Sequence, residues 1–119
     1  MFDDMTKEFI VTDCDTAAHV GSGTLEVLAT PIVAAWIEGM ATKIAKNLHS
    51  IEESTVGTNI NIDHLKKSKV GETITCHVNL TSQDRRKLTF TAECTNKSGD
   101  VIAKASHTRF IINIERFLS

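Results

Sequence analysis

The chain lacks the features that would place it in a specialised class of protein. Its 119 residues include no tyrosine and one tryptophan, so Ile, Val, Leu and Ala supply most of the core. The formal net charge of −2 leaves no broad basic surface, which argues against nucleic acid as a partner. The longest weakly polar stretch, residues 27–37, is too short to cross a bilayer. We therefore expect a single soluble domain over residues 1–119, with no membrane partner.

Cysteine is also scarce. Cys14, Cys76 and Cys94 form no CxxC pair and no spacing typical of metal ligands. An odd, widely separated set suits reduced thiols better than a disulfide framework. Residues 1–9 carry three acids, two of them adjacent early in the segment, and no apolar segment, unlike a signal peptide. The sequence thus predicts a cytoplasmic protein without a metal site.

The first half of the chain predicts a strand, a loop and a long helix. Residues 7–12 alternate as in a short strand, and residues 13–29 indicate a loop with a short helical turn. Thr30 followed by Pro31 predicts a helix start, with the threonine hydroxyl as N-cap and proline at the first helical position. An apolar stripe then continues to about His49.

Period-2 alternation predicts four strands after the helix. They cover residues 56–64, 71–80, 87–95 and 101–116, and the order predicts a meander. On the first of these strands we expect one face made of Val56, Thr58, Ile60, Ile62 and His64. His77 and His107 alternate with polar strand residues, so both are expected to be exposed.

The order of elements predicts an α+β architecture. A helix of about five turns is roughly 30 Å long, and its apolar stripe needs an equally long sheet to cover it. A curled antiparallel sheet of about five strands wrapped around one helix satisfies this requirement. Such a sheet leaves edges and apolar surface that need cover, so we expect a homodimer.

Three local motifs in this order resemble one family. They are Leu28-Ala29-Thr30 with Glu38 eight positions after Thr30, VGTNINIDH (56–64), and the pair DRRKLTF (84–90) and SHTRFIINIERF (106–117). Together they resemble the hotdog-fold thioesterases, specifically the fluoroacetyl-CoA thioesterase-like branch. The resemblance implies hydrolysis of an acyl-CoA, with a short or small acyl group, to the free acid and coenzyme A. Coenzyme A is then part of the substrate, and no other cofactor is implied.

The resemblance also implies roles for particular residues. Thr30, Glu38 and His64 would form the catalytic set, while Gly57, Arg109 and Leu28 would contact the substrate. The sequence departs from the fluoroacetyl-specific member where its aromatic residues have become Leu25, Val27 and Leu28, and where Pro31 follows the threonine. No phenylalanine lid is evident, which argues against fluoroacetyl specificity.

The residues themselves leave alternatives open. A helix carboxylate such as Glu38 is often simply exposed, although its apolar neighbours favour the partial burial of a general base. Thr30 could be only a helix cap, and His64 only a hydrogen-bonded structural residue. Because eight helical residues span about 12 Å, Thr30 and Glu38 would meet only from the two ends of a substrate, through irregular backbone, or across a dimer interface.

Gly57, Arg109 and the basic turns are equally open to two interpretations. Gly57 permits a close backbone approach or marks a bulge, and Arg109 could pair with a substrate or form an ordinary salt bridge. Six basic residues in two turns could meet the phosphates of coenzyme A or be solvated. They are Lys66, Lys67, Lys69, Arg85, Arg86 and Lys87.

Two other functions fit the same fold. The protein could bind acyl-CoA without turnover, or it could be a hydro-lyase in which Asp63 and His64 act together. Adjacent strand residues point to opposite faces, which counts against the hydro-lyase.

Overall fold

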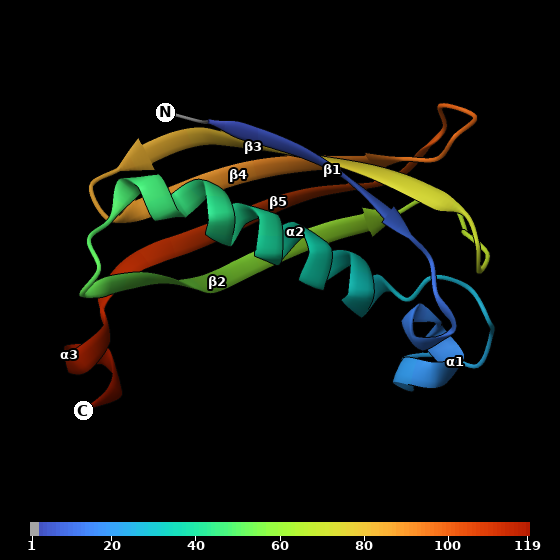
Figure 1. Ribbon diagram of the computed structural model, residues 1–119, viewed down its shortest axis with the longest axis horizontal. Helices are drawn as coiled ribbons and strands as arrows, with labels where there is room; N and C mark the ends of the chain where they lie inside the picture. The colour runs from blue at the N-terminus through green and yellow to red at the C-terminus, as the bar shows by residue number, and fades with distance from the viewer. Residues whose placement is uncertain (1–2) are drawn as a thin grey trace.

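One long helix lies against a single curled sheet in the computed structural model, which describes residues 3–119 (Figure 1). The elements in chain order are β1 (Asp4–Ile10), η1 (Asp13–Asp15), α1 (Ala17–Val20), α2 (Thr30–Ala45), η2 (Lys46–Leu48), β2 (Glu53–His64), β3 (Thr73–Asp84), β4 (Lys87–Thr95), β5 (Val101–Asn113) and α3 (Ile114–Leu118). The predicted α+β architecture of one helix and five antiparallel strands is confirmed.

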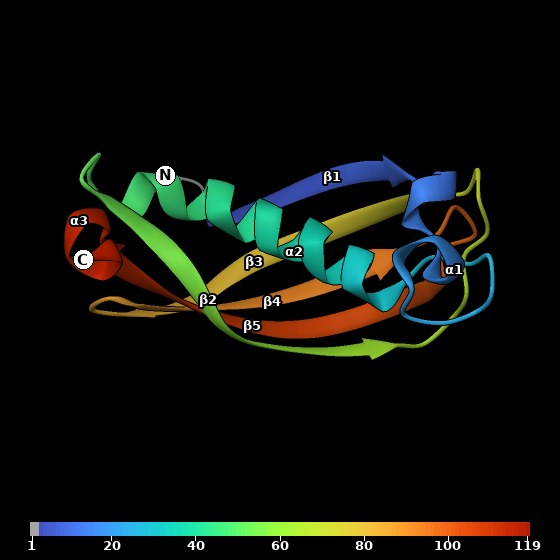
Figure 2. The same cartoon turned by 90° about the horizontal axis from the view of Figure 1, so that it is seen from below.

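The sheet order is β1-β3-β4-β5-β2. Strands β3, β4 and β5 form the predicted meander, but the prediction was wrong for β2, which pairs with β5 instead of β3. Residues 65–72, which follow β2, cross to the part of the sheet where β3 lies. Within this connection the Ser68 carbonyl accepts a hydrogen bond from Leu28 N–H. β1 and β2 are therefore the two edges, and the sheet curls so that both contact α2 (Figure 2).

The core lies between α2 and the concave face of the sheet. Val33, Ile37, Met40 and Ile44 are buried at helical spacing on α2, which confirms the predicted stripe. The predicted inward residues of β3 and β4 that are buried against it are Ile74, Cys76, Val78, Leu88, Phe90, Ala92 and Cys94. Alternate strand positions thus form one continuous apolar face, as period-2 patterning requires.

A bulge in β2 changes which residues face the helix. The pairing of β2 with β5 shifts register between Gly57 and Asn59. After the bulge Ile60 and His64 lie on the helix side, as predicted, opposite inward residues of β5. Before it the buried residue is Thr55, so the predicted continuation of this face to Val56 was wrong. One extra residue in a strand reverses the alternation.

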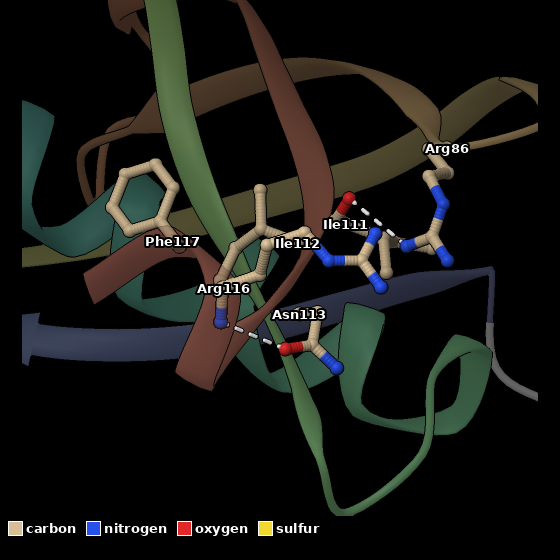
Figure 3. Close-up of a pocket in the computed structure, with 6 residues that line it drawn as sticks. All are labelled: Arg86, Ile111, Ile112, Asn113, Arg116 and Phe117. Atoms are coloured by element: carbon tan, nitrogen blue, oxygen red, sulfur yellow. Dashed lines mark hydrogen bonds between the residues drawn. The ribbon is translucent and has the colours of Figure 1, made fainter. Parts of the chain in front are cut away.

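Both ends of the sheet differ from the predicted bounds. β1 begins at Asp4 and ends at Ile10 rather than covering 7–12. β5 ends at Asn113 rather than continuing to 116, because Asn113 accepts a hydrogen bond from Arg116 N–H at 2.9 Å and caps the short helix α3 (Figure 3).

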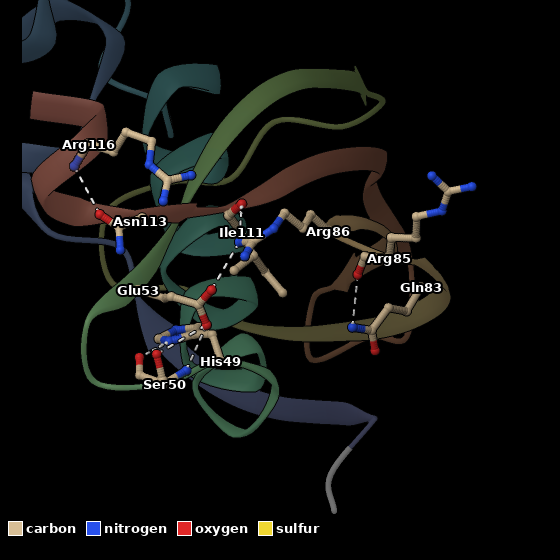
Figure 4. A network of polar contacts seen from close by, with 9 residues as sticks. All are labelled: His49, Ser50, Glu53, Gln83, Arg85, Arg86, Ile111, Asn113 and Arg116. Atoms are coloured by element: carbon tan, nitrogen blue, oxygen red, sulfur yellow. Dashed lines mark hydrogen bonds and ion pairs between the residues drawn. The ribbon is translucent and has the colours of Figure 1, made fainter.

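A polar network fixes the start of β2 against the hairpin between β3 and β4. The Glu53 carboxylate accepts from Ser50 N–H at 3.0 Å and forms an ion pair with Arg86 at 3.0 Å (Figure 4). The Ser50 backbone N–H and then the Arg86 guanidinium lower the pKa of Glu53. The ion pair thus ties the first residue of β2 to the opposite hairpin.

Candidate active site

A hydrogen bond joins two of the predicted catalytic residues. Thr30 Oγ1 lies 2.8 Å from His64 Nδ1, linking the first residue of α2 to the last residue of β2. The predicted role of Thr30 as N-cap was wrong. Ala29 occupies that position without a side-chain cap, and its carbonyl accepts from Val33 N–H. The Thr30 hydroxyl is therefore available to the histidine.

The two residues line an open groove of about 360 Å³. Its other walls are formed by Ala17, Ser22, Val27, Leu28, Ala29, Pro31, Leu65, Lys66 and Lys67. His64 is half-buried, and burial lowers its pKa, so the imidazole is neutral near pH 7. Within residues 3–119 its Nε2 has no hydrogen-bond partner. An apolar wall, a neutral imidazole and two lysines thus meet in one groove.

A second group of polar residues surrounds Gly57 in the middle of β2. A Cβ atom on this glycine would lie 3.1 Å from Glu38 Oε2, 3.1 Å from His107 Cε1 and 3.2 Å from Arg109 Nη1. The close approach and the bulge that the sequence offered as alternatives for Gly57 are both present. The lack of a Cβ at Gly57 therefore lets a carboxylate, an imidazole and a guanidinium approach its backbone closely, and we call this meeting point the Gly57 slot.

Arg109 is buried and is held by its neighbours on β2. Its Nε–H donates to Thr55 Oγ1 at 2.9 Å, and its Nη2–H donates to the Thr55 carbonyl at 3.0 Å. No carboxylate lies within ion-pair distance of Arg109 in the described part of the chain, so the alternative of an ordinary salt bridge was wrong. Burial lowers the pKa of Arg109, and the nearby Glu38 carboxylate opposes this shift.

His107 was predicted to be exposed, and this was wrong. Its side chain is 1% exposed and lies between α2 and the sheet. In the surrounding sequence, SHTRF, both faces of the strand carry polar residues. The alternation alone therefore does not identify the inward face. His107 and Arg109 lie on the same inward face of β5. In the paired strands His107 is opposite Ile60 and Arg109 is opposite Gly57 of β2.

Glu38 and the Thr30–His64 pair are separate within one chain. Because α2 is one regular helix from Thr30 to Ala45, the separation of eight positions from Thr30 to Glu38 corresponds to about 12 Å. Glu38 is half-buried, so of the two alternatives left open by the sequence, partial burial is the one present. Its carboxylate forms no hydrogen bond or ion pair within residues 3–119, which leaves both oxygens free to accept.

A family model described as fluoroacetyl-CoA-specific thioesterase matches residues 11–115. The chain belongs to this family. A solved structure of a variant of the fluoroacetyl-CoA-specific thioesterase FlK, in complex with fluoroacetate and CoA, is 24% identical, with 96% of this chain and 95% of that chain covered and a TM-score of 0.88. No curated protein sequence matches the chain.

Two further solved structures share the fold of this thioesterase family member. A thioesterase superfamily protein of Thermus thermophilus is 19% identical, with 97% and 85% of the two chains covered and a TM-score of 0.88. A Streptococcus mutans protein bound to acetyl CoA is 16% identical, with 93% and 82% covered and a TM-score of 0.78. The hotdog fold and the acyl-CoA thioesterase class that the resemblance implied are confirmed.

The basic residues of this family member divide between two ends of the sheet. Lys66 and Lys67 line the Thr30–His64 groove, and Lys69 lines the adjoining hollow. Arg86 lies at the other end, in a hollow of about 380 Å³ whose remaining walls are Ile111, Ile112, Asn113, Arg116 and Phe117 (Figure 3). That hollow contains no carboxylate, imidazole or hydroxyl, so it offers no group for hydrolysis.

Residues 3–119 contain no cluster of His, Cys, Asp and Glu able to hold a metal ion. No helix in the same residues is long and apolar enough to cross a membrane.

Proposed function

We propose that this chain hydrolyses the thioester of an acyl-CoA with a short or small acyl group, releasing the free acid and coenzyme A. One observation carries the proposal: the Thr30 hydroxyl and the neutral His64 imidazole are hydrogen-bonded at 2.8 Å in a groove with two lysines. The groove provides apolar surface for the acyl group and cations for the coenzyme phosphates. The resemblance places Leu25, Val27 and Leu28 where the fluoroacetyl-specific member has aromatic residues, which argues against fluoroacetyl as the acyl group.

Each residue of the candidate site has a separate role in the proposed reaction. Glu38, whose carboxylate has no hydrogen-bond or ion-pair partner within residues 3–119, takes a proton from water while the water oxygen bonds to the thioester carbon. His64 Nε2–H stabilises the resulting oxyanion as its Nδ1 accepts from the Thr30 hydroxyl. The carbon–sulfur bond then breaks, and Glu38 returns its proton to the coenzyme thiolate. Arg109 and Gly57 border the Gly57 slot beside Glu38 and hold the carbonyl end of the substrate.

A homodimer would bring Glu38 to the Thr30–His64 pair. β2 is a free edge, and Gly57, Thr58 and Asn59 on it are exposed, so its backbone groups are open to a second chain. Two copies of β2 related by a two-fold axis run antiparallel. An axis near residue 60 lays Gly57 of one protomer beside the end of β2 in the partner. Each active site would then take Glu38 from one protomer and His64 from the other.

Release of free thiol from a panel of short, branched, aromatic and long acyl-CoAs tests the proposed activity. We expect hydrolysis of the short or small acyl groups, with Glu38→Gln and His64→Ala each lowering kcat by about 100-fold or more. Unchanged hydrolysis by either variant would overturn the residue assignment. Binding of acyl-CoA by calorimetry without thiol release would instead support a binding protein.

Mixed dimers test whether the site is shared. Glu38→Gln and His64→Ala chains, unfolded and refolded together, form hybrids in which one site has both intact residues. Random mixing should restore about one quarter of the wild-type activity. No recovery in hybrids, or a monomeric mass by light scattering at micromolar concentration, would overturn the shared site.

We also propose a cytoplasmic location. Its support is that Cys14, Cys76 and Cys94 are free thiols, which suits a reducing compartment. Fractionation of the source cells, with detection of the native chain, tests this expectation.

A further inference from the structure

We propose that His107 is a positioning residue that holds the Arg109 guanidinium at the Gly57 slot beside Glu38. The effect on catalysis rests on the proposed function, whereas the positioning itself rests on geometry alone. His107 was not among the residues that the sequence marked as functional. The positioning role of His107 follows from two hydrogen bonds, which determine which of its ring nitrogens carries the proton.

The surroundings of His107 leave it no solvent partner. The side chain is 1% exposed, and its ring centroid lies 6.0 Å from that of the fully buried Phe90 on β4. In the paired strands it stands opposite Ile60 of β2. A polar ring in such a place is stabilised only if protein groups satisfy both of its nitrogens.

Both ring nitrogens of His107 have such a partner. Nδ1 lies 2.7 Å from the Asn59 carbonyl oxygen, which can only accept, so Nδ1 carries the hydrogen. Nε2 lies 3.2 Å from Nη1 of Arg109, which can only donate, so Nε2 must be unprotonated. The two contacts together require the neutral ring with its proton on Nδ1.

His107 thereby connects the β2 bulge to the cation. Asn59 is the first paired residue after the bulge, and Arg109 stands opposite Gly57, just before it. Thr55 holds the Nε and Nη2 sides of the guanidinium, and within residues 3–119 only His107 holds Nη1. Nη1 is also the guanidinium atom that borders the Gly57 slot. Loss of the His107 acceptor would free the one edge of the cation that faces Glu38 and the substrate.

Burial, aided by the Arg109 charge, lowers the pKa of His107 and so favours its neutral form near pH 7. In the described part of the chain, the charged groups that face His107 are Glu38 from α2 and Arg109 from β5, while β2 and β4 contribute Ile60 and Phe90. Burial lowers the pKa of His107, and Arg109 adds to this effect, against opposing contributions from the Asn59 carbonyl and Glu38. Protonation would turn Nε2 into a donor that faces another donor, and the guanidinium would have to move.

Two substitutions separate the two hydrogen bonds. His107→Asn places an amide nitrogen near the Nδ1 position and so retains the bond to Asn59, but it offers no acceptor to Arg109. His107→Gln places its amide oxygen near the Nε2 position and so retains the acceptor for Arg109. We expect kcat/KM for acyl-CoA to fall about tenfold or more in His107→Asn, and His107→Gln to recover a substantial part of that loss.

Nitrogen NMR of the wild-type chain supplies a readout that does not depend on activity. It should show His107 as the neutral ring protonated on Nδ1, and the Arg109 Nε–H as an ordered resonance that broadens in His107→Asn but persists in His107→Gln. A ring protonated on Nε2, or equal kcat/KM in the wild type and His107→Asn, would overturn the proposal. If the wild type releases no thiol, the proposed function fails and the NMR result alone decides the positioning role. The wild-type spectrum also decides it if His107→Asn does not fold.

Discussion

The hydrogen bond between Thr30 Oγ1 and His64 Nδ1 connects residues 34 positions apart, at the start of α2 and the end of β2. It closes one end of the layer between helix and sheet, and it fixes the orientation of the imidazole in the groove. The same contact therefore has a structural and a proposed catalytic consequence, which substitutions at Thr30 can separate.

Thr30→Val retains the shape of the side chain and removes its hydroxyl. We expect kcat/KM for the best acyl-CoA substrate to fall about ten- to 100-fold, because the imidazole loses the partner that orients it. The free energy of unfolding should fall by only about 0.5–1.5 kcal/mol, the net value of one hydrogen bond. Thiol release and urea unfolding measure the two effects.

Thr30→Ser is the matched control, since it keeps the hydroxyl and loses a methyl group. It should retain most of the activity that Thr30→Val loses. Equal activity in the valine variant and the wild type would show that the Thr30–His64 contact is only structural.

Gly57→Ala should damage the Gly57 slot more than the fold. The added methyl group would lie 3.1–3.2 Å from Glu38, His107 and Arg109, so these side chains must shift by a few tenths of an ångström. Since all three border the proposed reaction site, we expect kcat/KM to fall about tenfold or more. Steady-state kinetics with short acyl-CoAs measures this loss.

Gly39→Ala, one position after Glu38 on α2, is the control for a glycine without close neighbours. A Cβ there meets nothing within 4 Å, and alanine is the better helix former by about 1 kcal/mol. The variant should therefore be more stable in urea, with activity retained. A Gly57→Ala protein with wild-type kinetics would remove the argument for a tightly bordered slot.

The sequence predicted what depends on local pattern and failed where a distant contact decides. The helix stripe through Ile37 and the inward face of β4 through Phe90 were predicted correctly, because each repeats over many residues. The N-cap prediction for Thr30 used a valid local signal, but a strand residue 34 positions later provides the hydroxyl with its partner. At Thr30 the partner of the hydroxyl is therefore determined by a tertiary contact and not by local helix-capping propensity.

The Gly57 slot was harder to predict for a related reason. The bulge after Gly57 reverses the alternation of β2, and no residue type marks the change of face with certainty. His107 is flanked by Ser106 and Thr108, so hydrophobicity does not identify its buried side. Only the pairing of β2 with β5, which joins distant segments, places His107 and Arg109 beside Glu38.

The stability of the protein should decrease as the pH falls below about 6.5. Burial lowers the folded-state pKa of both His64 and His107 from the ordinary histidine value of 6.5. The unfolded chain therefore binds more protons than the folded chain in this range, and the stabilisation present above pH 6.5 is progressively lost on acidification. Urea unfolding at intervals from pH 4 to pH 8 measures the slope.

Two variants assign this slope. His107→Gln, which cannot titrate, should flatten the decrease between pH 6.5 and pH 5. Glu53→Gln should leave that range unchanged and flatten the decrease below about pH 4.5, because the Ser50 backbone N–H and then Arg86 lower the pKa of Glu53 from the ordinary glutamate value of 4.5. A wild-type stability that is constant from pH 8 to pH 5 would contradict the neutral, buried state of the two histidines.

Charge reversal at Lys67 tests which part of the substrate the groove lysines contact. Lys67 lines the Thr30–His64 groove and takes part in no ion pair within residues 3–119, whereas Lys66 already contacts Asp100 at 3.4 Å. If Lys67 meets a coenzyme phosphate, Lys67→Glu should raise the KM for acyl-CoA about tenfold at low salt, and less as salt screens the charge. The KM for the same acyl group on N-acetylcysteamine, which carries no phosphate, should not change.

Lys7→Glu on β1, the sheet edge opposite β2, is the matched charge reversal and should leave both KM values near wild type. A similar rise for both substrates in Lys67→Glu would place this lysine at the acyl end of the groove instead.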